Sequence, residues 1–139
     1  MKPPLDRERG TTAIELVLVA PVFLAALLLV VGLGRIVEAE GRVQGAAQDA
    51  ARAASISRNA DLAQASAQQA AAANLTTGGV SCSSFDVTVE AADFRPGGLV
   101  RVSVACVADL SGLALAGLPG SKILHADATA PLEQYRGTG

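Results

Sequence analysis

The longest apolar segment of the chain covers residues 16–34, and no charged side chain occurs within it. A helix rises about 1.5 Å per residue, so a segment of this length extends about 28 Å, close to the hydrocarbon thickness of a bilayer. Glu15 and Arg35 bound the segment. The rest of the chain is too short to surround such a helix on all sides. The pattern therefore predicts a membrane-inserted helix.

A cleavable secretory signal is the main alternative for this segment. Such signals usually have an apolar region of about 7–15 residues, followed by a cleavage site with two small residues. The apolar segment here is longer, and the best site after it, Val37-Glu38-Ala39, contains a glutamate. We expect the segment to remain attached, and a secreted protein that begins near Glu40 is the alternative.

The cations that flank the apolar segment indicate its orientation. Lys2, Arg7 and Arg9 precede it, while Arg35 and Arg42 follow it. Cytoplasmic flanks carry the excess of Lys and Arg, and acidic residues count little in this rule. We expect the N-terminus in the cytoplasm and the C-terminal part of the chain outside.

Residues 35–75 have the composition of a long helix that continues beyond the membrane. They contain no proline and many alanines, the best helix formers. Glu38 and Arg42 are spaced as a helix-supporting pair. A narrow stripe of apolar residues is spaced as one helix face: Ile36, Val43, Ala47, Ala50 and Ala54. Residues 57–61 could interrupt the helix, with Ser57 or Asn59 capping a new start.

The period of the pattern changes after the turn at residues 76–79. Apolar and polar residues then alternate over residues 85–91, 100–106 and 122–131, which is typical of half-buried strands. The intervening segments contain Pro and Gly in turn positions. We predict a three-stranded antiparallel sheet with one face covered by the long helix, and hence an α+β fold.

Composition restricts the possible functions. The chain has 28 alanines among its 139 residues, four aromatic residues and no Trp, so its core must be thin. The net charge is −2, and no Lys/Arg cluster suited to a nucleic-acid surface occurs. Cys82 and Cys106 are the only cysteines. An even number of cysteines in a domain outside the membrane favours a disulfide; the alternatives are free buried cysteines or a pair too distant to bond.

No constellation with recognisable catalytic chemistry is present. His125 is the only histidine, and Asp127 could orient it on the same strand face, but no nucleophile motif accompanies the pair. Two cysteines and one distant histidine provide too few ligands for a zinc site. We expect no catalytic residue, no metal, no cofactor and no small-molecule substrate.

The residues before the apolar segment resemble a known processing signal. Arg9-Gly10-Thr11-Thr12-Ala13-Ile14-Glu15 is similar to the leader of type IV prepilins. This resemblance implies that a membrane prepilin peptidase cuts after Gly10, so that Thr11 becomes the new N-terminus. Glu15 would then be the fifth residue of the mature protein, close to the new amino group or to a neighbouring subunit. Such pairing lowers the cost of a carboxylate in lipid and fixes the axial register of the helices.

Further residues extend the resemblance to the TadE-like family, minor pilin-like components of tight-adherence (Flp-type) pilus systems. These are Pro21 early in the apolar helix and the Ala/Arg-rich stretch at residues 46–52. The resemblance implies a pilin-like structural subunit in the bacterial cytoplasmic membrane or an extracellular pilus. It also implies partners: the prepilin peptidase, other pilins and pseudopilins, and the pilus assembly platform. A kink at Pro21 would ease helix packing in a filament.

We therefore expect four segments: a leader at residues 1–10, a transmembrane helix at 11–34, a helical stalk at 35–75 and a small β domain at 76–139. The alternative is a single-pass anchored domain that binds a ligand outside the membrane without any role in a pilus. In that protein Glu15 only reaches the headgroup region, and the leader remains uncut.

Overall fold

The computed structural model describes residues 8–92, 94–109, 111 and 120–133. Two helices precede three strands: α1 (Glu8–Ser55), α2 (Ala60–Thr77), β1 (Cys82–Ala91), β2 (Leu99–Asp109) and β3 (Ser121–Pro131). The predicted α+β class, with a long apolar N-terminal helix, is confirmed. The chain divides into two compact units, Met1–Arg35 and Ile36–Gly139, and α1 contributes to both.

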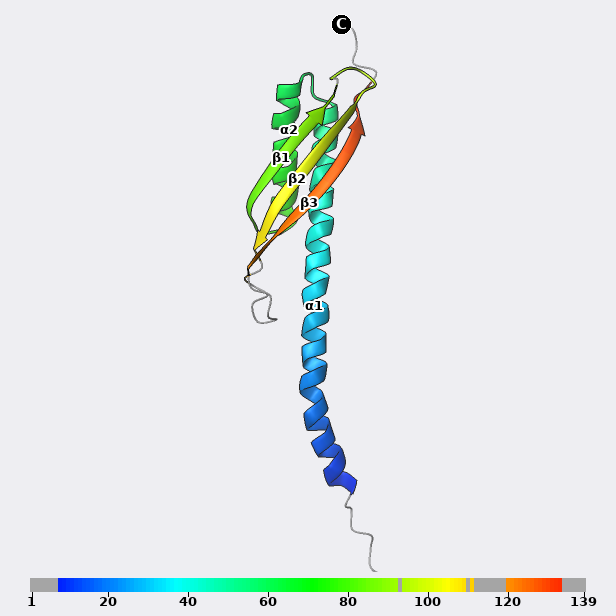
Figure 1. Ribbon diagram of the computed structural model, residues 1–139, viewed down its shortest axis with the longest axis vertical. Coiled ribbons are helices and arrows are strands. Elements are labelled where there is room, and N and C mark those ends of the chain that lie inside the picture. The colour runs from blue at the N-terminus through cyan, green and yellow to red at the C-terminus, as the bar shows by residue number, and fades with distance from the viewer. Residues whose placement is uncertain (1–7, 93, 110, 112–119, 134–139) are drawn as a thin grey trace, which may run out of the picture. The chain divides into compact units, whose positions relative to one another are not determined.

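The second unit is a layer of helices on a sheet. The strands are antiparallel in the order β1-β2-β3, so β2 is central and the other two are edge strands. Residues 36–55 of α1 and all of α2 lie side by side on one face of this sheet, while no described residue forms a helix on its other face (Figure 1). The predicted meander is therefore confirmed, with its register set by pairs such as Val87 with Val104 and Val104 with Ala126.

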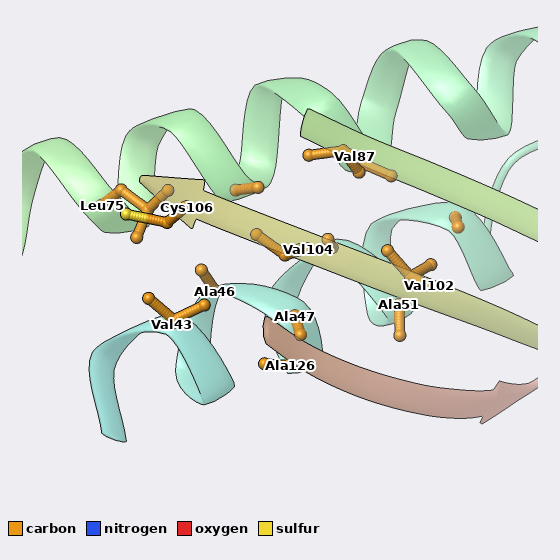
Figure 2. Close-up of a cluster of buried hydrophobic side chains, with 14 of the residues drawn as sticks. Val43, Ala46, Ala47, Ala51, Leu75, Val87, Val102, Val104, Cys106 and Ala126 are labelled. Atoms are coloured by element: carbon orange, nitrogen blue, oxygen red, sulfur yellow. The ribbon is translucent and has the colours of Figure 1, made fainter. Parts of the chain in front are cut away.

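The core between the two layers combines alanines from the helices with valines from the sheet. Val102, Val104 and Cys106 of β2 are fully or almost fully buried, and they face small side chains of both helices (Figure 2). The buried helical residues of this core are Val43, Ala46, Ala47, Ala50, Ala51, Ala54, Ala63, Ala67, Ala71 and Leu75. Four members of the predicted stripe are among them, whereas Ile36 is only half-buried. Because alanine projects so little, both helices can approach the sheet closely.

The helical region is interrupted at the predicted place. α1 ends at Ser55, and Asn59 caps α2, because its side-chain oxygen accepts a hydrogen bond of 2.8 Å from the Leu62 N–H. Ser57, the other predicted cap, instead donates its hydroxyl to the Ala53 carbonyl. Asn is among the most favourable N-cap residues. The short connection turns the chain back, so α2 runs antiparallel to α1 and doubles the helical cover of the sheet (Figure 1).

The two helices are joined along their shared side by polar contacts. The Asn74 amide donates a hydrogen bond of 2.6 Å to the Asp49 carboxylate, and Gly45 lies beside Asn74. The last turn of α2 contains no basic residue of its own. Instead, the guanidinium of Arg42 from α1 lies against Gly78 at this end of α2. A cation at this end complements the negative pole of the helix dipole. Arg42 is also paired with Glu38 at 2.7 Å, as the spacing predicted.

Two glycines should respond oppositely to substitution by alanine. Gly41 lies within α1 with open space around it, so Gly41→Ala should stabilise the second unit by about 0.5–1 kcal/mol. Gly79 has a φ of 69°, so Gly79→Ala should destabilise it by about 1 kcal/mol. Thermal unfolding of the full chain in detergent, followed by circular dichroism, measures both effects. A shift of the same sign for both variants would contradict this account.

Candidate functional site

The first turns of α1 contain the residues for which the sequence predicts processing and assembly. Gly10 and Thr11 both lie within α1, which begins at Glu8. Glu15 follows Thr11 by four residues, about one turn, so the two positions share one side of the helix. The Glu15 side chain is exposed. The helix backbone therefore brings the predicted new N-terminus and the predicted register residue together, while residues 1–7 of the leader lie outside the described residues.

The apolar part of α1 is a candidate membrane anchor. Its large side chains are exposed to between 41% and 72%. They are Ile14, Leu16, Val17, Leu18, Val19, Val22, Phe23, Leu24, Leu27, Leu28, Leu29, Val30, Val31 and Leu33. The most apolar window of 18 residues has a mean hydropathy of 3.0, and only 6% of it is buried. By length and composition, this segment is therefore a candidate to cross a membrane.

Pro21 lies within α1, with helical residues on both sides. Proline has no backbone N–H, so the Val17 carbonyl loses its usual partner in the helix. Membrane helices tolerate such breaks where neighbouring groups can compensate. The predicted kink at Pro21 stays a prediction.

A disulfide joins Cys82 to Cys106, which confirms the pairing favoured by the sequence. Cys106 is fully buried in the central strand, whereas Cys82 begins β1 and is half-buried. The bond closes a loop with a sequence separation of 24 residues. It therefore connects the start of an edge strand covalently to the core.

A β-bulge places the Cys82 side chain on the buried face. Between Ser84 and Ala91, the residues of β1 pair with β2 in one register, but Cys82 pairs with Ala108 after a shift at Cys82/Ser84. Without this shift, strict alternation from Phe85 would turn Cys82 toward the outer face. An extra residue in one strand has no signature in an apolar/polar alternation, so the sequence analysis could not predict it.

Each edge strand is capped at one point by a glutamine from the helix beneath it. The Gln64 amide of α2 donates to the Val87 carbonyl at 2.6 Å and accepts from the Val89 N–H at 3.1 Å. On the opposite edge, Gln44 of α1 donates to the Asp127 carbonyl at 3.0 Å. An edge strand exposes unpaired backbone groups that invite pairing with another chain. These glutamines satisfy part of each edge.

A groove lies between α1 and the first half of β3. It has a volume of about 500 Å³ and is lined by Val37, Glu40, Gly41 and Gln44 of α1 and by residues 122–125 of β3. An ion pair of 2.9 Å between Lys122 and Glu40 links its two walls. Gly41 contributes no side chain, and a Cβ added there would meet nothing within 4 Å. Neither this groove nor the glutamine caps were predicted, because they depend on how the helices lie against the sheet edges.

The outer face of the sheet holds the only histidine. His125 is exposed there, and Asp127 accepts a hydrogen bond from the Ser103 hydroxyl across the strand pair. In the described part of the chain, no group of three or more His, Cys, Asp or Glu residues is placed to hold a metal ion.

Removal of the disulfide should weaken the second unit strongly. The double substitution Cys82→Ala with Cys106→Ala should lower the free energy of unfolding by about 3 kcal/mol, because the unfolded chain regains the freedom of the closed loop. Denaturant unfolding of the full chain in detergent, with and without reductant, measures the effect. Reductant should destabilise the original protein to a similar extent and leave the double variant unchanged. Equal stability of the two proteins under oxidising conditions would refute a stabilising role.

Comparison with known proteins finds a similarity in the N-terminal part of the chain. Residues 10–52 match the family model described as TadE-like protein. No curated protein and no solved structure matches the chain significantly. The matched residues include Gly10, Glu15, Pro21 and the Ala/Arg-rich stretch that carried the resemblance. The comparison therefore confirms that this segment is similar to the TadE-like family, which is linked to tight-adherence pilus systems.

Proposed function

We propose that this protein is a non-enzymatic, pilin-like subunit of a tight-adherence pilus assembly system, anchored in the membrane by α1. The observation that carries the proposal is the TadE-like match over residues 10–52. That match covers the residues of the predicted leader cleavage and the apolar helix with its exposed side chains. TadE-like pilin proteins are in general not enzymes. The role of the protein is accordingly structural: it takes part in initiating, capping or modulating a filament.

The proposed topology places the N-terminus in the cytoplasm and the second unit outside. The flanking cations favour this orientation. The Cys82–Cys106 disulfide supports it as well, because such bonds form and persist in oxidising compartments outside the cytoplasm. The proposed partners are a prepilin peptidase on the cytoplasmic side, other pilins and pseudopilins within the membrane, and the proteins of the assembly platform.

Cleavage after Gly10 is the proposed maturation step. It would give Thr11 a free amino group, which is positively charged at neutral pH, one helical turn from Glu15. In the low dielectric of the bilayer, that amine would stabilise the carboxylate of Glu15 in the same chain or in a neighbouring one. The charge pair would then fix the axial register of one helix relative to its neighbour.

The processing step can be tested by intact-mass analysis of protein purified from the membrane. Cells that contain the peptidase should yield a form that begins at Thr11, because residues 1–10 are removed. Gly10→Trp should leave only the precursor, since a bulky side chain cannot occupy the position that the glycine takes at the cleavage site. Gly41→Ala, which lies outside the leader, should be processed normally. Recovery of the original protein with its full leader would contradict the proposal.

The charge of Glu15 can be tested separately from insertion. Glu15→Ala should leave membrane fractionation unchanged, because removal of a charge makes insertion more favourable. The amount of pilin recovered with the variant by co-purification should fall about tenfold, the result of losing a charge pair in a medium of low dielectric. Glu15→Asp keeps the carboxylate and should retain most of the recovery. Normal pilus assembly by Glu15→Ala would count against the pairing.

A further inference from the structure

We infer that the second unit contacts a second copy of the same chain, with β1 of one copy added in parallel to the free edge of β3 in the next. In this contact, Phe85 of one copy fills the groove beside Gly41 of the other. The inference deepens the proposed function, since it names a partner surface for an assembling subunit. It depends on the geometry of the described residues within 36–139. A crosslinked dimer would therefore be detected whether or not the leader is cleaved.

The two edges are open in the same half of the sheet. Bonds from Gln64 reach the Val87 carbonyl and the Val89 N–H, so alternation directs the backbone groups of Phe85 to the free edge of β1. On β3, the side chain of Gln44 donates to the Asp127 carbonyl. Alternation therefore directs the backbone N–H and carbonyl groups of Ile123 and His125 to the same free edge of β3. The structure gives these outward groups of Phe85, Ile123 and His125 no hydrogen-bond partner within the described residues. An uncapped half-edge of this kind is a template for strand addition.

Shape complementarity joins Phe85 to the groove. Phe85 pairs with Cys106 in the register, so its side chain lies on the helix-covered face of the sheet, yet it is 36% exposed. The groove lies on the same face beside the other edge strand, since α1 forms one of its walls. Val37 borders it with an exposure of 68%. An aromatic side chain inserted over Gly41 would bury apolar surface that the single chain leaves in water.

One parallel register satisfies the backbone and the side chains together. If Phe85 of one copy stands beside Leu124 of the other, its N–H can donate to the Ile123 carbonyl and its carbonyl can accept from the His125 N–H. Leu124 lines the groove, so the same register brings the Phe85 ring to it. On the outer face, this register places Asp86 next to His125.

The charges of the two half-edges are complementary. The open half of β1 carries Asp86 and no basic residue, whereas the open half of β3 carries Lys122, which is also paired with Glu40, and no acidic residue. Like charges would face each other if β1 met β1, and the pairing of unlike edges avoids this.

The direction in which the chain enters the second unit favours a contact between unlike edges over the simplest symmetric contact. Antiparallel pairing of β3 with β3 of a second copy would reverse one unit relative to the other, so the two chains would enter their units at opposite ends. Both chains continue from residue 36 into a membrane-length apolar segment. Parallel addition of β1 to β3 keeps both entry points at the same end. Because the two surfaces differ, the contact is heterologous and can be repeated from copy to copy, as in a ring or a filament.

Photocrosslinking of the full-length protein in bacterial membranes tests this contact. With p-benzoylphenylalanine in place of Phe85, illumination should give a crosslinked dimer of the chain, and mass spectrometry should place the link within residues 37–44 or 122–125. The same probe at Leu99, which is 66% exposed at the other end of the sheet, should give no dimer. Absence of a dimer from position 85, equal yields from both positions, or a link to other residues would overturn the inference.

A substitution that fills the groove provides the second test. Gly41→Leu should lower the dimer yield from position 85 about tenfold, because its side chain occupies the space that Phe85 needs. The open surroundings of Gly41 make unfolding by this change unexpected, and circular dichroism checks the fold. Ala65→Leu introduces the same side chain at an exposed position of α2 and should leave the yield unchanged. An unchanged dimer yield in a folded Gly41→Leu variant would also overturn the inference.

Discussion

The close approach of two alanine-lined helices to a valine-lined sheet is the contact on which the second unit depends. Nearly all buried helical positions are alanine, so the helices supply little apolar surface of their own and instead let their backbones come near β2. A core of this kind gains less from the hydrophobic effect than one filled with aromatic residues. Other interactions must therefore supplement it, and the structure places them at the margins of the core.

These supplementary interactions share one arrangement. Each joins an edge strand to the central strand or to a helix, from which the edge strand could otherwise detach. The disulfide joins the start of β1 to the central strand, and Gln64 joins β1 to α2. Gln44 and the pair of Lys122 with Glu40 join β3 to α1. Since edge strands are the parts of a small sheet that open first, bonds at the edges protect a thin core more than bonds at its centre.

The elements of the fold could be predicted from the sequence because each has a periodicity of its own. The uncharged apolar run, the alanine stripe at helical spacing and the alternation around Val102 all indicate their structures locally. Asn59 could be predicted as a cap because capping depends on one side chain and its next residues. Gly10 at the end of the leader and Glu15 beyond it were found through a family pattern, and residues 10–52 match the TadE-like family model.

The features that could not be predicted depend on contacts between distant residues. The bulge beside Cys82 breaks an alternation by one residue, and a local pattern does not register this. Gln44 and Gln64 look like any glutamine on a solvated helix until the helix is placed against a strand edge. Gly41 reads as a weak point in a helix, whereas in the structure it opens a groove. In each case the information is in the packing of helix on sheet.

The covalent link between Cys82 and Cys106 also has a mechanical consequence. If a filament subunit is pulled between α1 and the end of β3, the residues outside the closed loop can be extended. The residues between Cys82 and Cys106, a sequence separation of 24, cannot be extended while the disulfide is intact. At about 3.4 Å per residue, this withholds about 80 Å of extension. A subunit under load would thus reach its maximum extension sooner than it would without the disulfide.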